Sequence, residues 1–323
     1  MRNIKKEVCV LDTSVATSNV GDEIIMSSVR KELNSLFEWG FFTRLPAKEH
    51  IFRVGLGVIR RSDYTFVGGT NFLSSFMNKF RAWQIWLWQA FFIREKIILM
   101  GVGWRDYQGL PNFYTKLLLK LVLDKKAFHS VRDDYTKKKL ESIGFKNVVN
   151  TACPTMWLLT EAHCNDIPQE KSERVIFTLT TYLPDLELDK TFVETLLAKY
   201  KEVVFWPQGR GDLDYFYSLG LDAEAKVRII SPNLDSYDSY LSQNESDYIG
   251  TRLHGGIRAI QNKKRTLIIG VDNRAEEKKV DFNLNVVSRG DWDGLNNFIS
   301  GKFPTKVKIP VVEINLWKEQ FCR

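Results

Sequence analysis

The sequence has few cysteines and histidines, and it lacks the spacings from which metal sites are usually built. Its 323 residues include four cysteines and four histidines, and no two cysteines form a C-x-x-C pair. A zinc site based on paired cysteines is therefore not predicted. No other cluster of metal-ligand residues is visible in the sequence, so we expect no metal site.

The sequence also lacks the usual nucleotide-binding motifs. No stretch matches G-x-G-x-x-G or a Walker loop, so nucleotide binding through either device is not supported. The 46 Lys and Arg residues exceed the 39 Asp and Glu residues and give a formal net charge of +7. These basic residues are scattered and form no stripe, which argues against a nucleic acid partner. A mild positive excess fits phosphorylated substrates or an anionic membrane surface.

Long hydrophobic runs are absent as well. The first residues, MRNIKKEVCVLDTS, hold no apolar stretch long enough for a signal peptide, and we expect a cytoplasmic protein with reduced thiols. The segment AWQIWLWQAFFI (82–93) is almost wholly apolar but falls short of the roughly 20 residues that a membrane-spanning helix needs. It is either a buried helix between sheet layers or an interfacial helix that contacts a membrane peripherally through its tryptophans, at the inner face.

Short apolar runs alternate with longer helical patterns, which indicates parallel sheets with helical crossovers. The polar segment 157–174 contains Pro168 and interrupts this rhythm, so it is the expected linker. The fold class predicted is α/β, with two Rossmann-like domains facing a cleft, at residues 1–160 and 161–323. Strands are expected within 7–13, 63–69, 96–103, 127–134, 147–154, 174–182, 202–209, 228–232, 247–256 and 265–272.

Polar residues and glycines collect where the expected strands end, which is where open parallel sheets bind ligands. The most informative of these segments is GTRLHGGIRA (250–259). If the strand continues, Arg252 and His254 fall on one side of it. Gly255 and Gly256 then remove side chains where a helix begins, and a helix N-terminus attracts anions. These residues predict a pocket for phosphate and carboxylate; the alternative is a histidine that packs at a domain junction.

Two other segments allow both a structural and a functional interpretation. Gly68 and Gly69 either let the backbone approach a ligand or simply make a turn. Arg132 lies between an expected strand and a helix. It either forms a surface ion pair with a nearby carboxylate or presents its guanidinium to a carboxylate or phosphate.

Five segments together resemble the polysaccharide pyruvyl transferase family in order and spacing, from about Val8 to Asn273. They are SNVGDEII, FVGGTNFL, GVGW, HSVRDDYTKKKLESIGFKNVV with the CP that follows, and DYIGTRLHGGIRAIQNKKRTLIIGVDN. The resemblance implies a two-domain fold similar to GT-B glycosyltransferases, with the acceptor side in 1–160 and the donor side in 161–323. The sequence departs from the family at CPTMWLL, which lacks the usual acidic residue, and at Thr70, where a third glycine is common.

The resemblance also implies an activity and its site. Phosphoenolpyruvate would be the donor, with no cofactor, and two hydroxyls of a sugar in a cell-surface polysaccharide or its lipid-linked precursor would be bridged by a pyruvate ketal. Arg132, Arg252 and His254 match the residues implicated around the donor. Asp22 is the candidate for orienting or deprotonating the acceptor, although capping its helix is the alternative. Substrate contacts are expected at Asn19, Gly21, Gly68, Gly69, Thr70, Gly255 and Gly256.

The proposed donor suits these residue types. Two arginines match its phosphate and carboxylate, and histidine is the side chain whose ordinary pKa lies nearest neutrality. We therefore assign His254 the protonation of C3 of the donor or of the departing phosphate. Two other functions remain open: a GT-B glycosyltransferase that uses a nucleotide sugar, and a non-catalytic protein that binds an anionic glycan.

Overall fold

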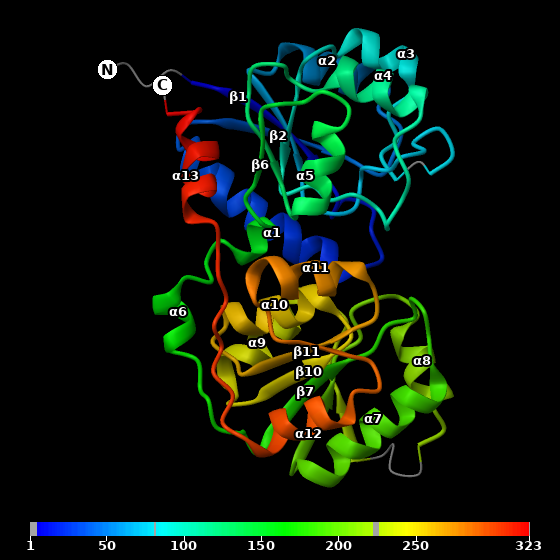
Figure 1. Cartoon of the computed structure of the whole chain (residues 1–323), viewed down its shortest axis with the longest axis vertical. Coiled ribbons are helices and arrows are strands. Elements are labelled where there is room, and N and C mark those ends of the chain that lie inside the picture. The colour runs from blue at the N-terminus through cyan, green and yellow to red at the C-terminus, as the bar shows by residue number, and fades with distance from the viewer. Residues whose placement is uncertain (1–4, 81, 222–225, 323) are drawn as a thin grey trace. The chain divides into compact units, whose positions relative to one another are not determined.

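The computed structural model describes residues 5–80, 82–221 and 226–322, and the chain divides into two compact units (Figure 1). Unit 1 comprises Met1–Thr17, Ile25–Trp157 and Ile309–Arg323, and unit 2 comprises Ser18–Ile24 and Leu158–Lys308. The predicted domains, 1–160 and 161–323, differ from these units chiefly in two exchanged segments. Residues 18–24 lie with unit 2, and residues 309–323 return to unit 1.

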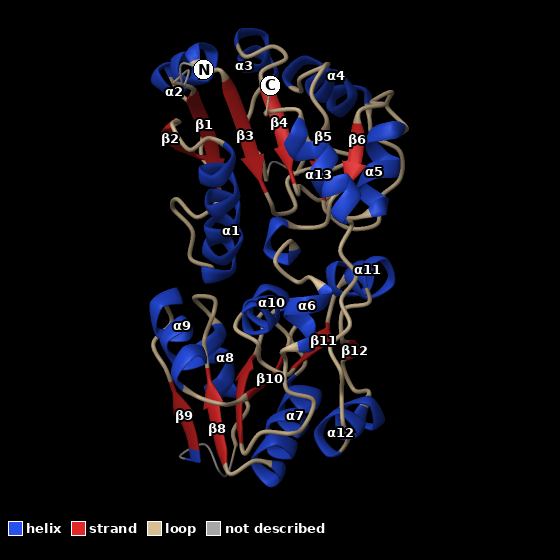
Figure 2. Cartoon of the chain, turned by 90° about the vertical axis from the view of Figure 1, so that its left-hand side faces the viewer, coloured by secondary structure: helices blue, strands red, loops and turns tan. Residues whose placement is uncertain are grey.

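Unit 1 contains a parallel sheet in the order β2-β1-β3-β4, and the parallel pair β5-β6 continues beside β4. Figure 2 shows β1, β3 and β4 next to one another. The strands are β1 (Glu7–Asp12), β2 (Phe41–Pro46), β3 (Tyr64–Gly68), β4 (Ile97–Met100), β5 (His129–Val131) and β6 (Val148–Asn150). The helices are α1 (Val20–Leu36), α2 (Arg53–Arg61), α3 (Leu87–Phe92), α4 (Phe113–Val122), α5 (Asp134–Glu141), the 3-10 turn η1 (Pro154–Met156) and α13 (Val311–Glu319).

Alternation along the strands of unit 1 divides its core between two helix layers. Cys9 and Leu11 of β1 pack in the cluster that contains the buried residues of α2, α3 and α4. Val8 and Val10 pack instead with buried residues of α1 and α13. Since successive strand side chains point to opposite faces, an apolar run such as VCVL supplies both layers.

Unit 2 contains a parallel sheet in the order β12-β11-β10-β7-β8-β9. Counted within the unit, this is the strand order of the doubly wound dinucleotide-binding fold, in which the first and fourth strands are neighbours at the centre. The strands are β7 (Arg174–Thr178), β8 (Glu202–Phe205), β9 (Val227–Ile229), β10 (Asp247–Gly250), β11 (Thr266–Gly270) and β12 (Val286–Ser288). The helices are α6 (Glu161–Asn165), α7 (Leu186–Lys199), α8 (Asp212–Ser218), α9 (Leu234–Gln243), α10 (Leu253–Gln261), α11 (Asn273–Phe282) and α12 (Trp292–Ser300).

The predicted fold class is confirmed: the chain is α/β with two parallel sheets, each covered by helices. The cleft between the domains stays a prediction. The expected linker at 157–174 is in part ordered, because it contains α6 and most of it belongs to unit 2.

The interpretation of residues 82–93 as a buried helix between sheet layers is wrong. Only Leu87–Phe92 is helical, and Trp88, Phe91 and Phe92 are more than half exposed, at 57%, 57% and 54%. Among the described residues, no helix combines the length and the apolarity that a membrane crossing requires.

Candidate active site

The candidate site of unit 2 lies where the strand order reverses, at the carboxyl ends of β7 and β10. These two strands pair in parallel, and Gly250 at the end of β10 stands opposite Thr178 at the end of β7. A Cβ at Gly250 would overlap the Thr178 hydroxyl and backbone, so glycine lets the two strand ends approach closely. Open α/β sheets bind ligands at such a reversal point, because the loops on either side diverge there.

Arg252 follows β10 at this point and pairs with a buried carboxylate. Its Nε donates to Asp212 Oδ2 and to the Leu179 carbonyl oxygen, both at 3.0 Å, and its Nη2 donates to Asp212 Oδ1. The Asp212 side chain is fully buried, whereas the Arg252 side chain is 14% exposed. The other edge of the guanidinium, formed by Nη1 and Nη2, has a free N–H on each nitrogen as far as the described residues go, and it can hold a second oxyanion.

Asp212 also fixes the loop that follows β8. Its Oδ2 accepts the backbone N–H groups of Gln208 and Gly209, at 3.1 and 2.8 Å. A Cβ at Gly209 would lie 2.5 Å from Arg252 Nη2, so only glycine leaves room for the guanidinium. Asp212 therefore holds Arg252 and the β8 loop in one arrangement.

The expected continuation of β10 through His254 is wrong. The strand ends at Gly250, Arg252 is the N-cap of α10, and His254 lies in the first turn of that helix, buried at 8% exposure. No described side chain caps α10 at Arg252, which leaves a helix N-terminus beside the strand ends. Arg252 and His254 therefore lie at the start of one helix, at its N-cap and second helical position, and not on one side of a strand.

The two glycines of this helix have a packing role. A Cβ at Gly256 would lie 2.6 Å from Ile268 Cγ1 and 2.9 Å from Tyr248 Cε1, and one at Gly255 would lie 3.0 Å from the Tyr248 hydroxyl. Tyr248 in turn donates from its hydroxyl to the Arg252 carbonyl oxygen at 2.8 Å. Burial raises the pKa of Tyr248, so this hydroxyl stays protonated and supports the backbone at Arg252.

Residues 18–24 bring the start of α1 to the same loop of unit 2. Gln208 donates from Nε2 to Asn19 Oδ1 at 3.0 Å, and the Val20 N–H donates to the Gln208 carbonyl oxygen at 2.9 Å. Asn19 Oδ1 also accepts the Gly21 N–H at 3.0 Å, and a Cβ at Gly21 would lie 2.6 Å from Gln208 Nε2. Asp22 is buried in the first turn of α1.

The other predicted residues lie in unit 1. The Arg132 side chain is 4% exposed, its Nε donates to Asp133 Oδ2 at 3.0 Å, and its guanidinium lies against Gly103. The expected surface ion pair is therefore a buried one. Gly69 has a φ of +54°, and a Cβ there would overlap Ile25 of α1; Thr70 has a φ of +57°. Gly68 likewise lies against Val29 of α1, so this glycine pair serves helix packing.

Sequence reasoning missed Asp212 and Gln208 as members of the site. Both belong to WPQGRGD, and the position of this segment after an apolar run was the signal that could have identified them.

Within the described residues, no group of three or more His, Cys, Asp or Glu side chains could hold a metal ion.

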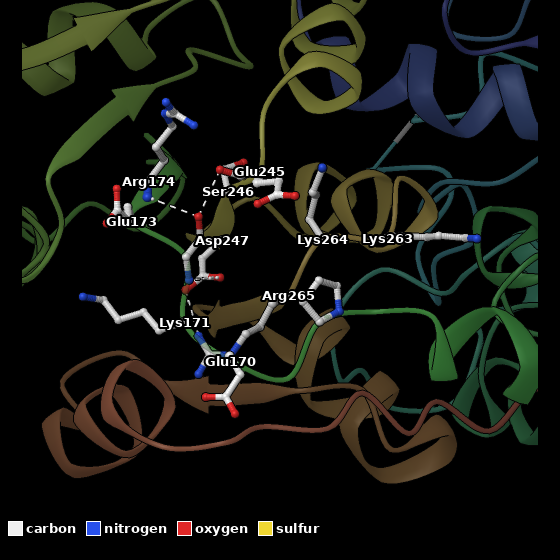
Figure 3. Close-up of a pocket in the computed structure, with 12 residues that line it drawn as sticks. Glu170, Lys171, Glu173, Arg174, Glu245, Ser246, Asp247, Lys263, Lys264 and Arg265 are labelled. Atoms are coloured by element: carbon white, nitrogen blue, oxygen red, sulfur yellow. Dashed lines mark hydrogen bonds and ion pairs between the residues drawn. The ribbon is translucent and has the colours of Figure 1, made fainter.

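A pocket of about 410 Å³ lies at the opposite, amino end of the same strands (Figure 3). Asp247 and Arg265, which line it, form a buried ion pair of 2.8 Å, and Arg265 also donates to the Gln169 and Gly301 carbonyl oxygens. These two residues are saturated by structural contacts. The pocket also lies at the amino ends of the strands, whereas open parallel sheets bind ligands at the carboxyl ends. We therefore do not place the site there.

Solved structures with a similar fold share little sequence with this chain. The UDP-GlcNAc 2-epimerase of Methanocaldococcus jannaschii, in complex with UDP-GlcNAc and UDP, is 12% identical with a TM-score of 0.56, and the match covers 97% of this chain and 100% of that one. MnaA of S. aureus, in a co-structure with UDP, is 11% identical with a TM-score of 0.53, covering 94% and 92%. At these identities the likeness concerns the fold alone, which is GT-B-like.

The sequence comparisons give the family. A search of curated proteins finds no significant match to this sequence. The family model for polysaccharide pyruvyl transferases matches residues 19–273, a range that contains every predicted site residue. This chain therefore belongs to the polysaccharide pyruvyl transferase family.

Proposed function

We propose that this protein transfers the enolpyruvyl-derived group of phosphoenolpyruvate to two hydroxyls of one sugar, forming a pyruvate ketal and releasing phosphate. The acceptor is a cell-surface polysaccharide or its lipid-linked precursor, and the reaction takes place in the cytoplasm. Family membership supports the reaction class. The observation that carries the proposal is the position of Arg252 at the strand reversal. Asp212 accepts from its Nε and Nη2, and the Nη1–Nη2 edge of the guanidinium faces away from Asp212.

The donor suits this arrangement because it carries two anionic groups. The outer edge of Arg252 pairs with one oxyanion in a bidentate manner, and the start of α10 adds its N–H groups. Asp212 compensates the charge of Arg252, so the bound anion is held by hydrogen bonds more than by net charge. Arg132 and the backbones at Asn19, Gly21, Gly68, Gly69, Thr70, Gly255 and Gly256 are the further residues proposed to contact the substrates.

Ketal formation then takes two balanced steps. One sugar hydroxyl adds to C2 of phosphoenolpyruvate while C3 gains a proton, which converts the methylene to a methyl group. The second hydroxyl then displaces phosphate from the same C2. His254 supplies the proton to C3 or to the departing phosphate, and Asp22 orients or deprotonates the acceptor hydroxyl. The donor side lies in 161–323 and the acceptor side in 1–160.

A second candidate is a GT-B glycosyltransferase that uses a nucleotide sugar. It is favoured by the likeness in fold to two structures that hold UDP. The same Arg252 edge and helix start would then hold a nucleotide phosphate.

Thermal unfolding with each ligand separates these functions. A ligand that binds only the folded protein stabilises it by about 2.7 kcal/mol at a hundredfold excess over Kd. We expect stabilisation by phosphoenolpyruvate, its loss in Arg252→Met, and its retention in Arg258→Met. Arg258 is the matched control because it lies on the same helix and pairs in the same bidentate way, with Asp238 at 2.7 and 2.6 Å.

Three outcomes would count against the proposal. Stabilisation by UDP-sugars alone would favour the glycosyltransferase. Binding of phosphoenolpyruvate with no phosphate release across a panel of sugar acceptors would favour a non-catalytic binding protein. An unchanged shift in Arg252→Met would remove Arg252 from the donor site.

A further inference from the structure

The helices α2, α3 and α4 of unit 1 form a layer that carries exposed, large apolar side chains. α3 packs against both α2 and α4, and Figures 1 and 2 both show the three helices next to one another. We call the exposed apolar residues on and beside these helices the helix-layer surface. They are Trp88, Phe91 and Phe92 of α3, Phe52 and Val54 at the start of α2, and Leu110 and Phe113 at the start of α4, with exposures between 54% and 80%.

The exposure of the α3 aromatics follows from a fixed orientation of that short helix. Trp86 Nε1 donates to His50 Nδ1 at 2.7 Å, and Gln89 Nε2 donates to the Ile51 carbonyl oxygen at 2.6 Å. Ala90 and Ile93 are fully buried in the core beneath the helix. Because the face of α3 that contains Ala90 packs on the core of unit 1, Trp88, Phe91 and Phe92 point outward. An outward cluster of this size on a held helix is typical of an interaction surface.

The three helices themselves carry charge of one sign, and the acidic residues Glu49, Asp63, Glu95 and Asp106 border the segments that contain them. The sequence has no Asp or Glu within 50–62, 64–94 or 107–123, the stretches that contain the three helices. Exposed basic side chains occur there at Arg53, Arg60, Arg94 and Lys120. Such a surface attracts an anionic partner and repels a second copy of itself.

We propose that unit 1 docks on an anionic phospholipid bilayer through the helix-layer surface. Aromatic side chains such as Trp88 enter the interfacial region, and basic side chains reach the headgroups with their long stems along apolar surface. The helices rest on the bilayer and do not cross it, since the longest of the three has ten residues. This docking goes beyond the proposed reaction and does not depend on it, because it uses helix faces and not the strand ends.

Sedimentation with lipid vesicles tests the proposal on the full-length protein. The probe is a phosphatidylcholine vesicle containing about one-third phosphatidylserine, at about 0.05 M and about 0.5 M salt. We expect binding at low salt and loss of most of it at high salt. The triple variant Trp88→Ser, Phe91→Ser, Phe92→Ser should bind at least about tenfold more weakly. The charge variant Arg60→Gln, Arg94→Gln, Lys120→Gln should lose about fivefold per removed charge.

Controls keep the result independent of folding and of catalysis. Tyr217→Ala removes an aromatic side chain that is 49% exposed on α8 of unit 2, and it should bind vesicles like the unchanged protein. The charge variant alters only exposed side chains, so it tests the surface even if the triple variant unfolds. Phosphoenolpyruvate binding in the absence of lipid should be the same in both variants, which separates this proposal from the proposed function.

Several results would overturn the docking proposal. They are no sedimentation at low salt, equal binding to vesicles of pure phosphatidylcholine, or equal loss of binding in Tyr217→Ala. Self-association without lipid that the triple variant abolishes would instead assign this surface to an interface between copies of the chain.

Discussion

The ion pair between Asp212 and Arg252 leads to a quantitative prediction for Asp212→Asn. In the protein, Asp212 Oδ2 accepts from Arg252 Nε and from the Gln208 and Gly209 backbones, and Oδ1 accepts from Arg252 Nη2. Asparagine keeps one oxygen for these donors but places an NH₂ group where Oδ1 stood. That group is itself a donor, so it faces Arg252 Nη2 without forming a hydrogen bond.

The expected cost follows from burial. Breaking a buried ion pair by changing one partner costs roughly 3–5 kcal/mol, because the other charge is left without compensation. The Arg252 side chain is 14% exposed and keeps its bond to the Leu179 carbonyl oxygen, so we expect the lower end, about 3 kcal/mol. The matched change Asp238→Asn should cost about 1 kcal/mol or less, since that pair is partly solvated, at 24% and 31% exposure.

Hydrogen exchange followed by mass spectrometry measures this loss of stability segment by segment. Such a local measurement suits a chain of two units that need not unfold together. Amides of β8 and β10 should exchange about a hundredfold faster in Asp212→Asn, and peptides of unit 1 should be unchanged. An effect under about threefold, or one equal to that of Asp238→Asn, would refute the role given to Asp212. A retained phosphoenolpyruvate KM in a folded Asp212→Asn would show that the position of Arg252 is not what the donor requires.

Two further predictions concern stability. Burial lowers the pKa of His129 to about 4, so its neutral imidazole contributes stability that is complete above about pH 6.5 and is lost as the pH falls toward 4. Lowering the pH from about 7 to about 5 should destabilise unit 1 by about 2 kcal/mol in urea unfolding, and His129→Gln should remove this part of the pH dependence; an identical slope in the variant would contradict the assignment. Gly256→Ala should destabilise by roughly 1–3 kcal/mol because its Cβ would meet Ile268 and Tyr248 at 2.6 and 2.9 Å. Gly57→Ala in α2, with nothing within 4 Å of its Cβ, should instead stabilise by about 0.5–1 kcal/mol, and equal melting temperatures for the two variants would argue against the packing role of Gly256.

Two of the elements that the sequence did not predict, β2 and α2, have weak local signals. The strand β2 pairs with β1, but its residues are mostly exposed, so it lacks the apolar pattern of a buried parallel strand. The helix α2 contains Gly55 and Gly57, which lower helix propensity, and its packing against the sheet outweighs this. In both cases the stabilising contacts come from elsewhere in the chain.

The segment 82–93 also shows that local sequence does not determine which side chains are buried. Its composition allows either a buried helix or an interfacial one; in the structure only one side of α3 faces the core, and Trp88, Phe91 and Phe92 are exposed. Composition says how apolar a segment is. Which of its side chains reach the core depends on the helix position, which here is set by hydrogen bonds to His50 and Ile51.

The sequence by itself determined the α/β class, the order of most strands along the chain, and the segments that follow them, because two-residue and helical periodicities are local properties. Only the tertiary structure decided the partners within the site. Asp212 lies 40 positions from Arg252, and Gln208 lies 189 positions from Asn19. These contacts arise because β7 and β10 are neighbours in the sheet while α1 begins in unit 2. Strand order and chain crossing are global outcomes of packing, and no local spacing of residues encodes them.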